Sequence, residues 1–296
     1  GRSPVHLTES KVTVLKDGSH EVSSGIHFVE GSAKVNATGD AILLCRGGTI
    51  EIGDRVHARV SDGEVKAKGN SYVDARGTTK VEAHDAAMIA ARENSTVHAL
   101  DRTTVAAEGQ SVVHLYGDAK ATARDSAGVT LYHKSSVVAR DQSSVTANHQ
   151  STVEASGQAS VGAVDQAKVK VSGECKVYAF DEASVKATGN SKVEATNNVN
   201  VVCSDSTTVT LSGKSTVEAH GNAKVSAFDE TSVIAMGKSR IEAQGNCSVG
   251  LFDSSSVTCK GTTKIIARHD SSVAASENST VSAYNRARVE LMGRAE

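Results

Sequence analysis

The sequence contains no tryptophan, only one proline and an aromatic content of 3%. Without large aromatic side chains it cannot build the core of an ordinary globular enzyme, and one proline does not suit a proline-rich linker. Its 32 basic and 34 acidic residues leave a formal net charge of −2. This balance gives the chain no general attraction to nucleic acid or to an anionic membrane surface.

Long hydrophobic runs and paired cysteines are also missing. The longest apolar runs, such as Ala41–Cys45, are far too short to cross a bilayer, and Gly1–Pro4 does not begin a secretion signal. The cysteines are odd in number and form no C-x-x-C motif, so we expect buried, unpaired thiols rather than a disulfide framework. Such thiols fit the cytoplasm or leaderless export within a larger protein, and the location stays open. The cysteines are Cys45, Cys175, Cys203, Cys247 and Cys259.

The sequence is dominated by an eight-residue repeat. Ser71 to Arg294 divides into 28 octads without insertion or deletion. Position 1 is Ser, Thr, Ala or Cys in 27 octads, position 3 is Val in 24, and position 5 is Ala in 20. Position 7 is Gly in 12 octads and Asp in nine, while positions 2, 4 and 6 vary and are mostly polar. A fixed period of this kind indicates a repeat architecture.

Each octad predicts a short strand followed by a tight corner. Apolar residues at positions 3 and 5 alternate with polar neighbours, as on a strand with one buried face. Valine at position 3 favours a strand. Gly, Asp, Asn and His at position 7 are the residues that best adopt a positive φ. We therefore predict an all-β fold, a parallel β-helix or β-solenoid.

The number of octads in one coil is inferred from residues that recur along the chain. Stacked coils place equivalent residues about 4.8 Å apart, so like residues should recur at the coil length. Asp181 and Asp205 are separated by 24 residues, as are Gly189 and Gly213. This spacing predicts a three-sided solenoid with 24 residues per coil, built from three octads. Together with Gly63–Asn70, the array comprises 29 octads, or nearly ten regular coils.

Residues 1–62 depart from the repeat and predict an N-terminal cap with irregular first coils, ahead of the regular solenoid at 63–296. Lys11–Val22 contains Asp17-Gly18, a pair typical of a hairpin turn. A cap would cover the strand edges that an open solenoid end exposes.

The octad Ser-Thr-Val-x-Ala-x-Gly-x, as at Ser151–Gln158, resembles the octapeptides of bacterial ice-nucleation proteins. It is also similar to the valine-spaced octads of phage-tail and secretion-spike needles, in which three chains share one coil. The chain lacks the Thr-x-Thr and Gly-Tyr-Gly signature of the ice nucleators, and it has Ala where the needles have Gly. The resemblance therefore concerns architecture, and no site residue is transferred from it.

Two sets of side chains are candidate binding residues. Stacked carboxylates repel one another by about 1 kcal/mol per pair in water, so an acidic column requires compensation. Bound Ca²⁺ would supply it, and so would hydrogen bonds from backbone N–H groups at each corner. Exposed aromatic rings beside such a column could bind a sugar or a protein partner, or they could simply cover the core. The candidates are Asp181, Asp205, Asp229, Asp253, Phe180, Phe228 and Phe252.

We expect a non-catalytic structural or interaction module, a rigid spacer or scaffold within a larger bacterial or phage-type protein. The alternatives are a glycan- or protein-binding solenoid that uses the Phe/Asp edge, a polysaccharide-active β-helix enzyme, and an ice-binding or filament-forming solenoid. We expect no cofactor apart from calcium at the aspartate column. We also expect no nucleic-acid partner and no membrane insertion, and either a monomer or end-to-end assembly.

Overall fold

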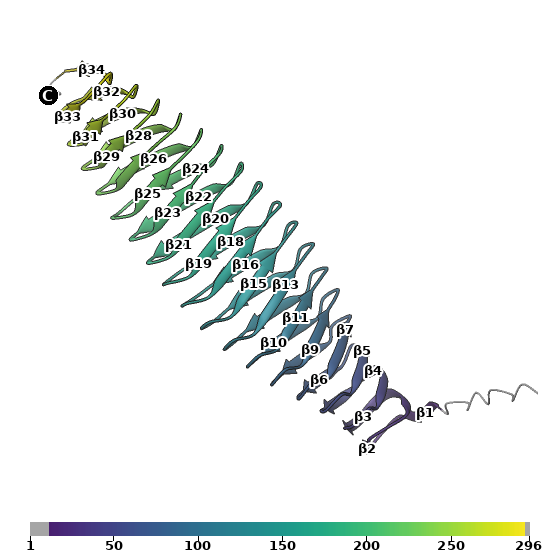
Figure 1. Ribbon diagram of the computed structural model, residues 1–296. Helices are drawn as coiled ribbons and strands as arrows, with labels where there is room; N and C mark the ends of the chain where they lie inside the picture. Colours follow the sequence, from purple (N-terminus) through teal and green to yellow (C-terminus); the bar gives the residue numbers. More distant parts are fainter. Residues whose placement is uncertain (1–11, 294–296) are drawn as a thin grey trace, which may run out of the picture. The chain divides into compact units, whose positions relative to one another are not determined.

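The computed structural model describes residues 12–293, and every regular element among them is a β-strand. The chain divides into two compact units, unit 1 up to Val129 and unit 2 from Thr130. Within each unit, strands of successive turns lie side by side in parallel (Figure 1). The prediction of an all-β parallel solenoid is confirmed.

The first strands belong to unit 1, with the last of them crossing the unit boundary. They are β1 (Val12–Leu15), β2 (Ser19–Val22), β3 (Ile26–Ala37), β4 (Ile42–Ile52), β5 (His57–Ser61), β6 (Glu64–Ala67), β7 (Tyr72–Arg76), β8 (Lys80–Ala83), β9 (Met88–Ala91), β10 (Thr96–Ala99), β11 (Thr104–Ala107), β12 (Val112–Leu115), β13 (Lys120–Ala123) and β14 (Gly128–Leu131).

The remaining strands belong to unit 2. They are β15 (Ser136–Ala139), β16 (Ser144–Ala147), β17 (Thr152–Ala155), β18 (Ser160–Ala163), β19 (Lys168–Val171), β20 (Lys176–Asp181), β21 (Ser184–Ala187), β22 (Lys192–Asn197), β23 (Asn200–Cys203), β24 (Thr208–Leu211), β25 (Thr216–Ala219), β26 (Lys224–Asp229), β27 (Ser232–Ala235), β28 (Arg240–Gly245), β29 (Ser248–Leu251), β30 (Ser256–Gly261), β31 (Lys264–Ala267), β32 (Ser272–Ser276), β33 (Thr280–Ala283) and β34 (Arg288–Met292).

Paired strands of the regular array are sixteen residues apart in the chain. Val97 of β10 lies beside Val81 of β8 on one side and Val113 of β12 on the other. Even-numbered strands thus pair with one another, and odd-numbered strands do the same. The predicted three-sided coil of 24 residues is therefore wrong, because each turn contains two octads. The chain makes about 18 turns, more than the predicted count of nearly ten.

The narrow core explains why the turn has two sides. From Val73 to Ala275, every residue at octad positions 3 and 5 is buried, as the alternation predicts. The residues at position 1, from Ser71 to Ser279, are buried as well. Two facing layers of Val and Ala fill the space between the ladders. The same small side chains would leave a void at the centre of a triangle, and protein interiors are close-packed.

Each turn is closed at two corners with positive φ. Every residue at octad position 7, from Gly77 to Gly293, has φ in the left-handed region, which confirms the predicted corners. Some of the buried hydroxyls at position 1 donate hydrogen bonds to these corners from inside. Ser143 Oγ donates to the carbonyl oxygen of Arg140 at 2.7 Å, and Ser239 Oγ donates to that of Met236 at 2.7 Å. At these corners the small residue at position 1 donates a hydrogen bond as well as fitting in the narrow space.

The described part of the N-terminal region also winds as parallel strands. β1 pairs with the first half of β3 and β2 with its second half, so the predicted hairpin at Lys11–Val22 is wrong. Several paired positions here are fifteen residues apart, such as Ile42 and His57. The cap assigned to residues 1–62 stays a prediction, and residues 1–11 lie outside the described residues.

Candidate functional site

The seven candidate binding residues lie on two different edges of unit 2. Positions 24 residues apart are one and a half turns apart, so they fall at opposite corners. The predicted single column of aspartates is therefore wrong. The 181 edge contains the corners Asp181, Asn197, Gly213 and Asp229, with Phe180 and Phe228 beside it. The 205 edge contains the corners Gly189, Asp205, Gly221, Gly237 and Asp253, with Phe252 beside it.

Three of the four aspartates connect one turn to the next. In each case the carboxylate accepts a hydrogen bond from the backbone N–H of the corner glycine sixteen residues earlier. The bonds are Gly189 to Asp205 at 3.0 Å, Gly213 to Asp229 at 3.1 Å and Gly237 to Asp253 at 3.1 Å. Asp181 instead accepts from Asn197 Nδ2 at 3.0 Å. These carboxylates satisfy corner donors, in line with the backbone-bonding alternative.

The geometry does not bring the predicted calcium ligands together. Asp181 and Asp229 share an edge but are three turns apart, about 14 Å at the usual strand spacing. Ca²⁺ needs several oxygen ligands within about 2.6 Å. Among residues 12–293, no group of three or more His, Cys, Asp or Glu side chains could hold a metal ion.

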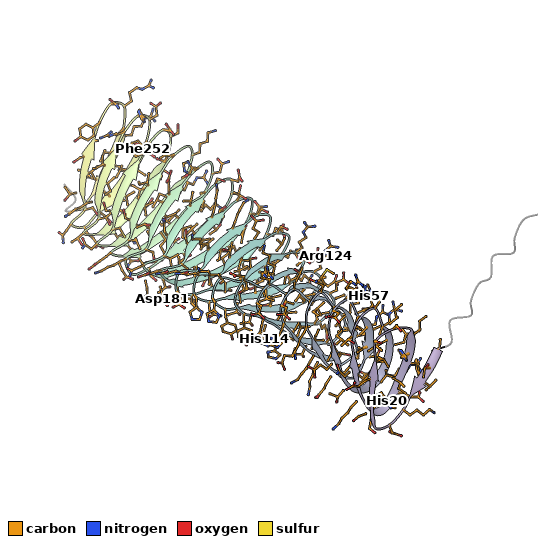
Figure 2. The ribbon with its side chains drawn as sticks, turned by 60° about the horizontal axis from the view of Figure 1, so that its bottom comes forward. His20, His57, His114, Arg124, Asp181 and Phe252 are labelled. Carbon is orange, nitrogen blue, oxygen red and sulfur yellow. The ribbon has the colours of Figure 1, made fainter. Side chains whose placement is uncertain are left out.

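The three phenylalanines do not form one strip. Phe180 and Phe228 are separated by three turns, and Thr196 of the next turn lies beside Phe180. Phe252 lies near the opposite edge, where its ring is 5.8 Å from the Arg268 guanidinium and 6.3 Å from the His269 ring. Figure 2 shows Asp181 and Phe252 well separated within unit 2. All three rings remain partly exposed.

The cysteines are buried and unpaired, as predicted. Burial raises the pKa of the Cys45 and Cys203 thiols to about 12. Burial also raises the pKa of Cys175 and Cys259. These thiols stay protonated at neutral pH, and the thiolate is the reactive form of cysteine.

A groove of about 600 Å³ runs along the corners of unit 2 that precede and include Asp181. We call it the histidine groove. Four successive corners and the residues that follow them line it. The lining residues are His133, Lys134, His149, Gln150, Asp165, Gln166, Asp181 and Glu182.

Polar ladders run along the histidine groove. The rings of His133 and His149 stack with centroids 5.5 Å apart and planes 10° apart. Gln166 Nε2 donates to Glu182 Oε2 at 3.1 Å, and Gln150 Nε2 contacts Gln166 Oε1 at 3.3 Å. The groove thus offers aromatic faces at one end and amide and carboxylate groups at the other.

Sequence reasoning missed this groove because a 24-residue coil places its members on different sides. With sixteen residues per turn, His133 and His149 become direct neighbours. The sixteen-residue spacing of His133 and His149, and the same spacing of Gln150 and Gln166, was the signal in the sequence that could have revealed the groove.

No helix among residues 12–293 is long and apolar enough to span a membrane. Comparison with protein-family models, with curated proteins and with solved structures gave no match.

Proposed function

We propose that this chain is a non-catalytic structural and interaction module, a rigid spacer or scaffold within a larger protein. The proposal rests on one observation: side chains that could act in catalysis or binding instead hold one turn to the next or are buried. The carboxylates of Asp205, Asp229 and Asp253 accept backbone N–H groups, and the cysteines are buried.

The strand ladders support the same function. From β15 to β34, each strand of unit 2 pairs in parallel and in register with the next strand of its ladder. The connecting corners are only a few residues long. In a repeat of this kind the free energy of unfolding is a sum of contributions from each turn and from the interfaces between turns. Stiffness follows from the unbroken register of strand pairing along the ladder.

Distance measurements between spin labels test this rigidity. Val138, Lys170 and Ile266 occupy the same outward position of odd-numbered strands in unit 2. Labels at V138C and I266C span eight turns, about 38 Å at the usual spacing. The pair K170C and I266C spans six turns and should give a distance shorter by about 10 Å.

Two narrow distance distributions that differ by this amount support a rigid spacer. A broad distribution, or equal distances for the two pairs, would contradict it. The buried native cysteines allow the labels to be attached selectively at the exposed positions.

A second function, recognition of a glycan, is favoured by the histidine groove. Its amide and carboxylate groups offer the donors and acceptors that sugar hydroxyls need. A glycan array should then bind the wild-type protein, and Gln166→Ala should weaken the strongest signal about tenfold, in line with a lost hydrogen bond. Gln110→Ala, at a corner of unit 1, is the matched control. Absence of any signal, or equal loss in both variants, would reject glycan binding at this groove.

A further inference from the structure

One carboxylate in the described part of the chain is buried, and three arginines surround it. Asp74 of β7 is 5% exposed, and the other buried polar residues among 12–293 are serines and threonines. Its position in the strand faces outward, where its partners in the adjacent turns are the exposed Arg59 and the small Ala90. Asp74 is therefore covered by side chains from adjacent turns rather than by the core.

The arginines come from three successive turns of the odd ladder. Arg59 Nε of β5 donates to Asp74 Oδ2 at 3.0 Å, and Arg76 Nη2 of β7 donates to the same oxygen at 3.0 Å. Arg92, which directly follows β9, places its Nε 3.5 Å from Asp74 Oδ1. One carboxylate thus gathers three guanidinium groups at one place on the ladder.

The guanidinium groups retain hydrogen-bonding capacity. Each carries five N–H donors, and Asp74 occupies one donor on Arg59 and two on Arg76. Arg92 Nε is buried and has no hydrogen-bond partner within residues 12–293. The side chains of Arg59, Arg76 and Arg92 are 59%, 35% and 42% exposed, so a ligand in solution can reach them.

These arginines line a groove of about 380 Å³ that also has an apolar wall. Ile42 and Leu44 are 43% and 37% exposed in it. The rings of His57 and Tyr72 are 5.6 Å apart at 39° and lie two residues before Arg59 and Asp74 on their strands. Figure 2 labels His57 in unit 1. The groove volume falls within the range of small-ligand sites.

Positive charge dominates this groove. Asp74 is the one carboxylate among its lining residues, against three guanidinium groups. Glu93 and Glu108 lie nearby but outside the lining. Glu93 accepts the Gly77 N–H at 2.9 Å, and Glu108 Oε2 is 3.8 Å from Arg92 Nε. Planar guanidinium groups match the geometry of carboxylate, sulfate and phosphate oxygens.

We infer that this groove binds a small ligand in which an oxyanion is attached to a ring. The oxyanion would accept hydrogen bonds from Arg59, Arg76 and Arg92. The ring would lie against Tyr72 and the apolar wall. Asp74 is then a positioning residue that holds the arginines toward the ligand. This inference is independent of the proposed scaffold function, because it concerns a surface of unit 1 that a spacer does not require.

Calorimetric titration of the full chain with simple probes tests the inference. The probes are phenyl phosphate, phenyl sulfate and benzoate, which distinguish the three oxyanions, together with inorganic phosphate and neutral phenol. We expect at least one ring-bearing anion to bind more tightly than inorganic phosphate, and phenol not to bind. Raising the salt concentration should weaken binding, because exposed charge pairs are screened.

Matched variants locate the site. Arg59→Met and Arg92→Met keep the length of the side chain and should each weaken binding at least tenfold. Arg55→Met removes an arginine paired with Asp40 outside the groove and should leave binding unchanged. Tyr72→Ala should reduce the advantage of the ring-bearing probe over inorganic phosphate.

Several outcomes would overturn the inference. One is that no anionic probe binds at millimolar concentration to the wild-type protein, a result that needs no variant. Another is unchanged binding in both Arg59→Met and Arg92→Met. Equal weakening by Arg55→Met would also reject it, since that result would show general charge attraction. Thermal melting of each variant verifies that it is folded.

Discussion

The backbone N–H of Gly213 donates to Asp229 Oδ2 at 3.1 Å, and these two residues occupy successive corners of one edge. The same bond joins Gly189 to Asp205 and, further on, Gly237 to Asp253. Each bond spans sixteen residues, and the bonded pair recurs every 24 residues at alternate edges. The 24-residue recurrence in the sequence therefore reflects the placement of these bonds and not the length of a turn.

Substitutions of Asp229 should separate the hydrogen bond from the backbone conformation. Asp229 has φ of 62° and accepts the Gly213 N–H. We expect Asp229→Ala to lower the free energy of unfolding by about 1–2 kcal/mol, because it removes the acceptor and strains a left-handed residue. Asp229→Gly loses the hydrogen bond but relieves the strain. Asp229→Asn keeps an acceptor for the Gly213 N–H and tolerates the positive φ. Urea unfolding should thus rank the losses Ala, Gly, Asn from largest to smallest, and any other order would contradict this account.

Gly213 should not tolerate a side chain. Its φ is 71°, and a Cβ atom there would lie 2.9 Å from Asn197 Cα in the preceding corner. We expect Gly213→Ala to lower the free energy of unfolding by about 2 kcal/mol or more, since backbone strain and a close contact combine. Gly162 is the control, because its φ is ordinary and its nearest neighbour would be 3.9 Å away. Equal effects of Gly213→Ala and Gly162→Ala in urea unfolding would refute the prediction.

Cys203 should be unreactive in the folded protein. It is 1% exposed, and burial raises its pKa to about 12, so the thiolate is scarce at pH 8. We expect an aromatic disulfide reagent to modify the native protein at pH 8 far more slowly than the protein unfolded in urea. An I266C variant supplies an exposed thiol as the internal standard for fast reaction. Rapid modification of Cys203 in the native state, located by mass spectrometry, would show that the core opens.

Asp74 should make stability depend on acid pH. Burial alone would raise its pKa, but hydrogen bonds from Arg76 and Arg59 and the charges of Arg76 and Arg92 outweigh burial, so the pKa lies below its ordinary value. A carboxyl with a lowered native pKa stabilises the fold above its unfolded pKa of about 3.9, and this contribution is lost as the pH falls through the native value.

We therefore expect Asp74→Asn to lower the free energy of unfolding by about 1–3 kcal/mol at pH 7, as for a lost ion pair whose partners can still be hydrated. The difference from wild type should shrink as the pH falls below about 4, where the carboxyl is protonated in the unfolded chain, and further as the pH falls through the lower native pKa. Urea unfolding of both proteins between pH 7 and pH 3 measures this. A difference that does not change with pH would show that the charge of Asp74 contributes nothing.

The site was less predictable than the fold. The groove around Asp74 depends on residues that pair across turns although they are fifteen rather than sixteen positions apart in the chain, such as Arg59 and Asp74. None of the three arginines carries a local motif, and their meeting at one carboxylate results from the pairing of adjacent turns. The histidine groove likewise exists only because His133 and His149 are one turn apart.

By itself the sequence determined the strands, the corners and the buried face. These are local properties: Val and Ala alternate with polar residues, and Gly, Asp, Asn and His adopt the positive φ at each corner. Only the tertiary structure decided that two octads make a turn. A turn could be built from two octads or from three, and the local preferences of the residues are the same in both cases. The choice depends on how well Val and Ala from facing ladders fill the interior, and close packing between two layers leaves no void.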